Sequence, residues 1–536
     1  MHLGGHPRAV ERRCGMEFTV ASMNAWLYPD SSAKGAVHEI SLDAVRGGSA
    51  GFQVLLTGAQ AGRLTVLPIA PADGVTVEAY RELSVYVNQN TGPKGFTADW
   101  ATASAYATRE APFRVYDALE PVPEGGLDVE AGTVAVYISL AVARDCAPGA
   151  YEGSVRIGVG GEEAAVALRL NVADAVLPAE SLKVTNWFSV GNMARYHGLE
   201  KWSEAHWSMI AEYGRLMRRM HQNVFWITWD VVDASVREDG SYAFDFAHCK
   251  RLIELYLGMG FTTIEGSPIY SRDNWDAVEF NVNTPKGRVK ALSDEAYEFV
   301  AALLTAWHDF LVENGWYGIT IQHVGDEPHE WAAAEYRILS GIVRKFMPGV
   351  PLIDAIETHE LQGSLDIWVP KNDYYTENRA HMERLRSLGD DIWFYTCCKP
   401  GGHYSNRVLD MPLQRIRMLH WGNFRYDISG YLHWGLNHWK ADQNPYELTA
   451  VPSSPTTFWP AGDTNIVYPL GDRVIGSMRA EIMKSGAEDY ELLRAAERKH
   501  PEEARAVCES LCRAFNDCDN TPEEFAAAYR RLLNLL

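Results

Sequence analysis

The feature that most constrains the fold of this chain is a regular alternation of apolar and amphipathic segments after Pro178. Short runs rich in β-branched and aromatic residues recur, and most are followed by apolar residues at helical spacing. Such a rhythm predicts parallel strands connected by helices. The eight predicted strands are 183–190, 224–229, 261–269, 319–324, 352–356, 365–369, 392–396 and 430–434.

Strand–helix units that repeat over roughly 250 residues match the size of a (β/α)8 barrel, also called a TIM barrel. We therefore assign 179–475 to such a barrel. A doubly wound open sheet is the alternative, but no GxGxxG motif follows the first strand of the region. The helix predicted from Ser293 carries one apolar stripe and ends before Gly315, a residue type that suits the position after a helix C-terminus.

The region before the predicted barrel, 16–178, carries strand signals and no long helical period. Gly and Pro separate its apolar runs, as in the turn at Gly160-Gly161. This pattern predicts an N-terminal β-sandwich. We find no catalytic constellation in it and expect it to support the barrel, with carbohydrate binding as the alternative role. The clearest predicted strands are 51–56, 134–142, 151–159 and 164–172.

The end of the chain, 476–536, is predicted to form helices that pack on the barrel. A helical pattern runs from Arg473 to Lys484, and Gly486 is expected to break it. Further helices are predicted over 488–499, 501–512 and 521–536.

The formal net charge of −21 argues against nucleic acid or an anionic membrane as a partner. No apolar run is long enough to span a bilayer, and the residues before Met16 lack the apolar segment of a secretory signal. Met16 is a candidate for the true start. We expect a cytoplasmic protein, monomeric or homodimeric, that acts on a glycan or another neutral ligand.

The eight cysteines form no CxxC motif, and the group near the C-terminus lacks nearby histidines at ligand spacing. We therefore predict reduced thiols, no metal site and no cofactor. The chain also contains 17 Trp and 25 Tyr, and flat aromatic faces are a common element of sugar-binding clefts.

The strongest candidate site lies in the stretch Ile319 to Glu330, which reads ITIQHVGDEPHE. Asp326 and Glu327 follow the fourth predicted strand, and the carboxyl ends of barrel strands form the active-site rim. Glycoside hydrolysis requires two carboxyl groups, and we expect Gly325 to relax the backbone so that both enter one pocket. Mutual repulsion would keep Glu327 protonated as a general acid and leave Asp326 as an anion. The alternative is an exposed turn that caps the following helix.

Other residues at predicted strand ends are candidates for substrate binding. Glu265 follows the third strand and could be a nucleophile or a buried structural carboxylate. His323 is expected to orient a carboxylate, and aromatic residues are expected to stack on a sugar ring. The substrate-binding candidates are Trp187, Trp229, Glu265, His323, Tyr395, Trp434, Asn437 and Trp439.

Four motifs together resemble glycoside hydrolase family 123. They are HVGDEP on the fourth strand, GYLHWGLNHW on the eighth, GDTNIVYP (Gly462 to Pro469) and SMRAEIMKSGAEDYELL (Ser477 to Leu493). CAPGAYEGSVRI (Cys146 to Ile157) looks like the last part of the sandwich of this family. The resemblance implies a β-N-acetylgalactosaminidase with an N-terminal β-sandwich and a (β/α)8 barrel.

The resemblance further implies roles for the carboxylate pair. Glu327 would be the general acid and base, and Asp326 would orient the 2-acetamido group, whose carbonyl oxygen attacks the anomeric carbon. An oxazolinium intermediate and retention of configuration follow. Two alternatives remain: a retaining glycosidase that acts on a sugar without the acetamide and uses Glu265 as nucleophile, and a catalytically silent carbohydrate-binding protein.

Overall fold

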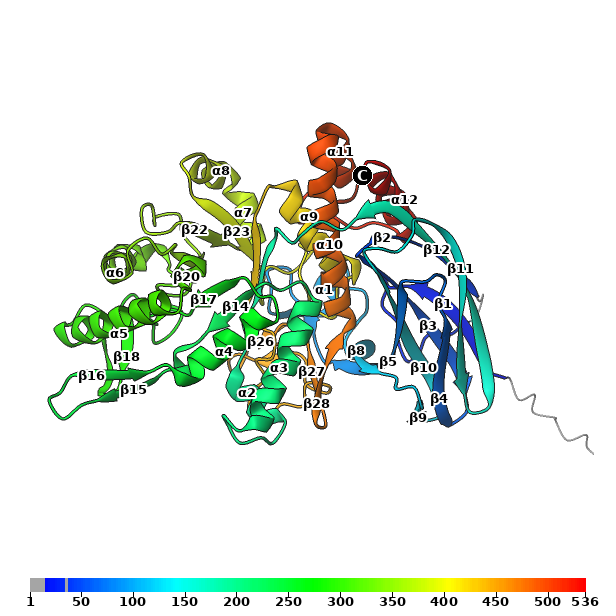
Figure 1. The fold of residues 1–536 in the computed structure, drawn as a ribbon, viewed down its shortest axis with the longest axis horizontal. Coiled ribbons are helices and arrows are strands. Elements are labelled where there is room, and N and C mark those ends of the chain that lie inside the picture. The colour runs from blue at the N-terminus through cyan, green and yellow to red at the C-terminus, as the bar shows by residue number, and fades with distance from the viewer. Residues whose placement is uncertain (1–14, 34–36) are drawn as a thin grey trace, which may run out of the picture. The chain divides into compact units, whose positions relative to one another are not determined.

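The structure is a computed structural model that describes residues 15–33 and 37–536 (Figure 1). The chain forms two compact units. The first contains the described residues up to Ser84 together with Leu119–Val176, and the second contains Val85–Ala118 together with Leu177–Leu536. The predicted N-terminal domain, 16–178, therefore includes a segment, 85–118, that groups with the second unit.

The first unit consists of two sheets that share one hydrophobic core. Strand β12 shows how the sequence builds this core, because its alternate residues from Ala164 to Val172 are buried and those between them face outward. One sheet contains, in order, β1 (Glu17–Ser22), β3 (Ser49–Ala59), β10 (Gly132–Val142) and β5 (Val75–Val87). The other contains β2 (Glu39–Arg46), β12 (Glu162–Val176), β11 (Gly149–Val159), β4 (Gly62–Ile69) and β9 (Leu127–Val129).

The second unit is organised around eight short parallel strands. Three of them form the sheet β14 (Val224–Ile227), β17 (Thr263–Gly266) and β20 (Thr320–Gln322). Five form the sheet β13 (Lys183–Asn186), β24 (Gly430–His433), β23 (Asp391–Tyr395), β22 (Ile367–Pro370) and β21 (Ile353–Ile356).

Hydrogen bonds link the two parallel sheets at both edges. The Gln322 N–H donates to the Pro351 carbonyl at 3.0 Å, beside the isolated parallel bridge of Gln322 with Leu352. At the other edge the Asn223 N–H donates to the Val184 carbonyl at 3.2 Å. All eight predicted strand positions are thus occupied by strands, and all of these except β23 are shorter than predicted.

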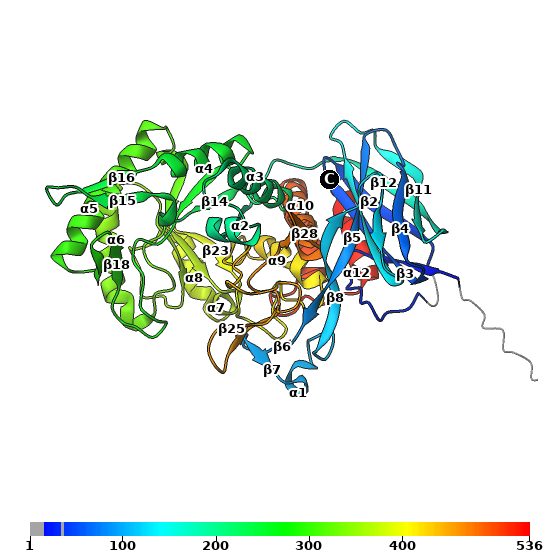
Figure 2. The same ribbon diagram turned by 90° about the horizontal axis from the view of Figure 1, so that it is seen from below.

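Helices follow most of these strands and lie around their outside (Figure 2). Ser203 and Ser293 cap the helices that were predicted to begin near them, each accepting a hydrogen bond from the backbone N–H three residues later. Gly315 has φ +73° after the cap Asn314, so its predicted position is confirmed. The helices are α2 (Val190–Tyr196), α3 (Glu204–Arg219), α4 (Ala247–Gly258), α5 (Asp294–Glu313), α6 (Ala333–Phe346), α7 (Asn372–Glu377), α8 (Arg379–Ser387) and α9 (Gln414–Arg425).

The predicted helix break at Gly486 is wrong. Residues Arg473–Ser477 form strand β28, and α10 then runs without interruption over Met478–Lys499. A Cβ atom at Gly486 would lie 2.8 Å from the Arg417 carbonyl oxygen of α9. Gly486 therefore allows two helices to approach closely and does not end one. Strand β27 (Tyr468–Leu470) pairs with β28, and α11 (Pro501–Leu511) and α12 (Pro522–Asn534) complete the unit.

A buried ion pair attaches the segment 85–118 to the rest of the second unit. The Arg479 Nε of α10 donates to the Asp117 carboxylate at 2.9 Å, and the Tyr468 hydroxyl donates to the same carboxylate at 2.7 Å. Asp117 and Arg479 are both fully buried. Asp117 belongs to β8 (Phe113–Pro121), and β6 (Asn90–Thr91), β7 (Thr97–Ala98) and α1 (Trp100–Ala103) precede it.

Among the described residues, no helix has the length and apolar character needed to cross a membrane.

Candidate active site

The carboxylate pair follows β20, as predicted, and its backbone is unusual. Glu327 has φ +46°, in the left-handed region that residues other than glycine rarely adopt. Such a conformation costs on the order of 1–3 kcal/mol and persists only where neighbouring groups hold it. Gly325 has a different role from the one expected, because a Cβ atom there would lie 2.7 Å from the Phe280 ring. Gly325 admits Phe280, and the left-handed turn falls on Glu327.

Arg272 is the group that holds this turn. Its Nη2 donates to the Glu327 carbonyl at 2.7 Å and to the Asp326 carbonyl at 3.4 Å. Its Nη1 donates to the Trp275 carbonyl at 2.9 Å. The sequence analysis did not identify Arg272, although its position in the loop after the third strand is a rim position of the kind searched. A single guanidinium therefore fixes the backbone of both carboxylates.

Tyr395, the last residue of β23, contacts the pair directly. Its hydroxyl donates a hydrogen bond to Glu327 Oε1 and lies 3.5 Å from Glu357 Oε1. Glu357 in turn forms an ion pair with the buried Lys371. Glu357 and Lys371 follow β21 and β22 immediately, so a search of strand ends for charged residues would have found them. Of the predicted substrate-binding residues, Tyr395 thus forms a direct hydrogen bond with Glu327.

The two carboxyl groups share an environment that disfavours double ionisation. Desolvation by the surrounding protein, then the charges of Glu327 and Asp354, raise the pKa of Asp326 to about 8, although the side chain reaches solvent. Desolvation also raises the pKa of Glu327, opposed by the charge of Lys371 and the hydrogen bond from Tyr395. The pair therefore retains one proton at neutral pH. The two groups titrate as one coupled pair, and the predicted role of Glu327 as the proton donor stays a prediction.

A buried histidine joins two further carboxylates behind the pair. His323 Nδ1 lies 2.6 Å from Asp354 Oδ1, and its Nε2 lies 2.9 Å from Glu265 Oε1. Burial alone would lower the pKa of His323, but the charges and hydrogen bonds of both carboxylates outweigh it and raise the pKa to about 10. Asp354 also accepts the N–H groups of Val324 and Gly325, each at 3.0 Å. This network fixes the strand end from which the carboxylate pair projects.

Glu265 is a structural carboxylate in this arrangement. It is fully buried and accepts hydrogen bonds from Thr185 Oγ1 at 2.6 Å and Trp187 Nε1 at 2.9 Å, besides its contact with His323. Each of its oxygens is thus engaged, which favours the structural interpretation over the nucleophile. Trp187 is half-buried and stacks on Trp226 with ring centroids 4.0 Å apart. Trp187 therefore belongs to the same hydrogen-bond network as Glu265.

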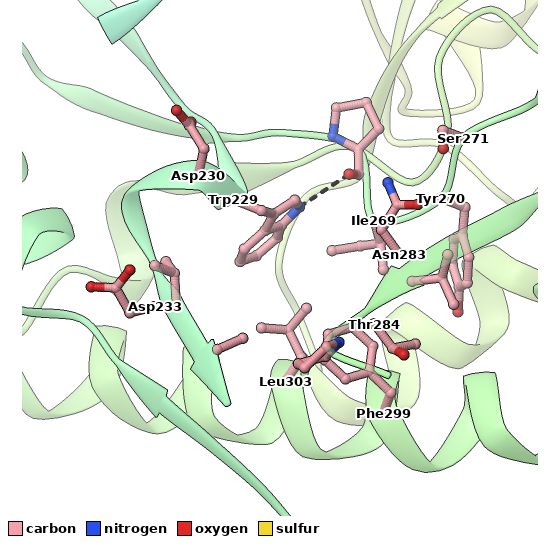
Figure 3. A pocket seen from close by; sticks show the side chains of 15 residues that line it. Trp229, Asp230, Asp233, Ile269, Tyr270, Ser271, Asn283, Thr284, Phe299 and Leu303 are labelled. Carbon is pink, nitrogen blue, oxygen red and sulfur yellow. Dashed lines mark hydrogen bonds between the residues drawn. The ribbon is translucent and has the colours of Figure 1, made fainter. Parts of the chain in front are cut away.

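Trp229 lies in a separate cavity of about 560 Å³ (Figure 3). Its Nε1 donates to the Pro268 carbonyl at 3.0 Å, and its ring meets Trp307 edge to face. The lining residues, all within the described part of the chain, include Tyr270 and Asn283 but neither carboxylate of the pair. The structure does not bring Trp229 to Asp326 and Glu327.

The three candidates after β24 have different surroundings. Asn437 is buried and pairs with both backbone groups of Ser189, at 2.8 Å and 3.2 Å, so it fixes the start of α2. Trp439 is buried and packs on Tyr196 with ring centroids 4.7 Å apart. Trp434 is half-buried and donates to Asp463 at 3.2 Å. Asn437 and Trp439 therefore have structural contacts, and only Trp434 retains an accessible face. Within the described part of the chain, no group of three or more His, Cys, Asp or Glu is arranged to hold a metal ion.

Parallel strands that present adjacent carboxylates at a carboxyl end are an arrangement that suits a glycoside hydrolase. The family model for the catalytic domain of glycoside hydrolase family 123 matches residues 187–496, and the chain belongs to this family. The resemblance noted in the sequence motifs is thereby confirmed.

One solved structure of the same family has this fold. A family 123 glycoside hydrolase from Clostridium perfringens, whose structural analysis addresses glycolipid glycan hydrolysis, is similar at 15% identity and a TM-score of 0.73, with 97% of each chain covered. A β-D-glucuronidase from Dictyoglomus thermophilum matches at 11% identity and a TM-score of 0.36, over 88% of this chain and 97% of that one. No curated protein matches the chain.

Proposed function

We propose that this glycoside hydrolase is a retaining, exo-acting enzyme that releases terminal β-linked N-acetylgalactosamine by substrate-assisted catalysis. The observation that carries the proposal is the consecutive pair Asp326–Glu327, held in a left-handed turn with one shared proton. Two neighbouring carboxyls are poorly placed to attack a sugar from opposite sides. They suit a reaction in which one moves the proton and the other positions a nucleophile that belongs to the substrate.

The proposed first step begins when the substrate enters. The acetamide N–H donates to Asp326, which stabilises the Asp326 carboxylate and moves the shared proton to Glu327. The acetamide carbonyl oxygen then attacks the anomeric carbon, the glycosidic bond breaks, and Glu327 gives its proton to the leaving oxygen. In the second step Glu327 takes a proton from water, which opens the oxazolinium ring from the opposite face. Two inversions give net retention.

We further propose that the eight parallel strands close into a (β/α)8 barrel and that the first unit is an N-terminal β-sandwich. The strand order and the hydrogen bonds at both sheet edges support closure. The side chains that surround the catalytic pair come from the carboxyl ends of successive strands, which is where barrel enzymes carry their active sites. The cytoplasmic location and the monomeric or homodimeric state stay predictions.

The engaged state of Glu265 also favours this mechanism over a retaining glycosidase with a protein nucleophile. Glu265 would have to lose its hydrogen bonds with Thr185, Trp187 and His323 before it could attack a sugar. Glu357, the other nearby carboxylate, is paired with Lys371. A substrate acetamide supplies the nucleophile without breaking either arrangement.

Aryl glycosides test the proposal. We expect hydrolysis of p-nitrophenyl β-N-acetylgalactosaminide, inhibition by a GalNAc-thiazoline analogue of the oxazolinium ion, and release of the β-anomer by NMR. Turnover restricted to sugars with a free 2-hydroxyl would replace the mechanism with the alternative that uses a protein nucleophile. The absence of turnover on any aryl glycoside would favour a silent carbohydrate-binding protein.

A further inference from the structure

An exposed aromatic cluster lies directly beside the catalytic pair. Trp275 and Trp331 expose 45% and 53% of their surfaces, which is unusual for side chains of this size. Both meet the same histidine, His329, with ring centroids 4.6 Å from Trp275 and 4.7 Å from Trp331. His329 follows Glu327 by two residues. The three rings form a small aromatic surface, which we call the Trp275–His329–Trp331 cluster.

His329 carries an unused hydrogen-bonding group within this cluster. Only 6% of the residue is exposed, and its Nε2 is buried without a hydrogen-bond partner. Desolvation, then the charges of Arg272 and Lys371, lower its pKa to about 4, so the ring is neutral at physiological pH. Leaving such a nitrogen unpaired is unfavourable, and a hydrogen bond from a ligand hydroxyl would remove that cost.

Arg272 connects the cluster to the catalytic pair. The guanidinium that donates to the Glu327 carbonyl also donates to the Trp275 carbonyl and lies 5.7 Å from the centre of the Trp275 ring. The chain segment of Trp275 is therefore tied to the turn that positions Glu327. A group stacked on the cluster would be held at a fixed place relative to the general acid.

We propose that the Trp275–His329–Trp331 cluster is the leaving-group subsite, which binds a neutral pyranose attached to the scissile oxygen. The proposal rests on the proposed function. Pyranose rings present an apolar C–H face that fits exposed indoles, and a hydroxyl that reaches the buried His329 Nε2 would give it a hydrogen-bond partner. The exposed carboxylates of Asp276 and Glu330 flank the cluster in sequence and disfavour acidic sugars and anionic lipids.

Two substrates that differ only in the leaving group test the subsite. We compare methyl β-N-acetylgalactosaminide with a trisaccharide that carries the same terminal sugar on lactose. The double variant Trp275→Ala/Trp331→Ala should lower kcat/KM for the trisaccharide about tenfold, because two aromatic contacts are lost. It should change kcat/KM for the methyl glycoside less than about twofold. Leu388→Ala truncates a side chain that is 72% exposed on another loop. This control variant should leave kcat/KM for both substrates unchanged.

A binding measurement separates this inference from the proposed function. Saturation-transfer NMR with lactose should show binding to the wild-type protein and loss of binding in the double variant, whether or not the protein hydrolyses β-N-acetylgalactosaminides. Lactose binding together with no turnover would contradict the proposed function and support the proposed subsite.

Three other outcomes overturn the subsite. They are equal losses on both substrates, no loss on either, and lactose binding that the double variant retains. Binding to phosphatidylcholine vesicles that requires both tryptophans, with no binding of lactose, would replace the sugar with a lipid surface. Thermal unfolding of each variant shows whether the protein remains folded.

Discussion

At the scale of residues, the carboxylate pair contains a strained residue that its neighbours hold in place. Glu327 adopts a left-handed backbone conformation, and Arg272 and Tyr395 bind its carbonyl and its carboxylate. The strain fixes the direction in which Glu327 projects, because a relaxed backbone would turn the side chain elsewhere. Positioning at this site is thus a property of three residues from three different parts of the chain.

Replacing Glu327 with Gln tests its role as general acid. The variant cannot donate a proton to the leaving oxygen, so activity on natural glycans should fall by about 10²–10⁴-fold. A good leaving group such as dinitrophenolate needs less protonation and should lose far less. Steady-state rates on the two substrate types measure the difference, and near-normal rates for both Glu327→Gln and Asp326→Asn on glycans would show that the site is wrong.

The shared proton predicts how activity depends on pH. The pair carries one proton below a pKa of about 8 and loses it above, so the general acid disappears as pH rises through that value. We expect kcat/KM to fall on the alkaline side with an apparent pKa near 8. In Asp326→Asn this alkaline limb should move, because the neighbouring charge that sustains it is gone. An unchanged limb in the variant would assign the titration to another group.

The same pKa predicts a pH-dependent stability difference. The pKa of Asp326 is about 8 in the folded protein and 3.8 in a free side chain, so its contribution to stability is lost as pH rises through that interval. The increase in melting temperature of Asp326→Asn over the wild type should therefore be larger at pH 8.5 than at pH 4. Asp239→Asn is a control for which the pH dependence of stability should have the opposite sign, because hydrogen bonds from Ser241 lower the pKa of Asp239.

The sequence predicted the position of the carboxylate pair and pointed to Tyr395 and His323, but it did not identify Arg272. The pair was visible because it directly follows an apolar strand. Arg272 acts through backbone carbonyls, and no pattern in the sequence indicates which carbonyls an arginine in a loop will reach. Asn437 and Trp439 were predicted to bind substrate because they lie near a strand end. Residues at such positions can instead hold the start of a helix, as Asn437 does, or pack in the core, as Trp439 does.

At the scale of elements, the two helices α9 and α10 show a limit of propensity rules. Gly486 resembles a helix breaker in the sequence, yet it lies inside α10 where α9 approaches most closely. Tertiary packing decided its role, and packing partners distant in sequence are not visible from local spacing. The strands are likewise shorter than their apolar runs, since the run beginning at Val224 ends at Ile227 and continues as a 3-10 turn from Trp229.

A pair of glycine variants tests this packing. Gly486→Ala places a methyl group 2.8 Å from the Arg417 carbonyl and should destabilise the protein by about 1–3 kcal/mol. Gly341→Ala in α6 meets no atom within 4 Å and should stabilise it by about 0.5–1 kcal/mol through helix propensity. Chemical denaturation measures both, and equal effects would remove the packing explanation.

At the scale of the whole molecule, the second unit is assembled from two separate stretches of sequence. Asp117 and Arg479 join them as a buried ion pair, and one partner without the other would be an uncompensated buried charge. Asp117→Ala should therefore cost about 3–5 kcal/mol of unfolding free energy. Asp128→Ala removes an exposed pair with Arg63 in the first unit and should cost less than about 1 kcal/mol. Similar losses in the two variants would contradict this role of the ion pair.

The interleaving of the two units bears on how such an enzyme can be inherited. A recombination event that copies only the sequence after Pro178 would carry Arg479 without Asp117 and would leave Asp410 without Thr91, which donates to it at 2.6 Å. The second unit therefore cannot be transferred intact as the sequence after Pro178 alone. Evolution would have to exchange it together with the β-rich region that interrupts it, so the two units are expected to share one history.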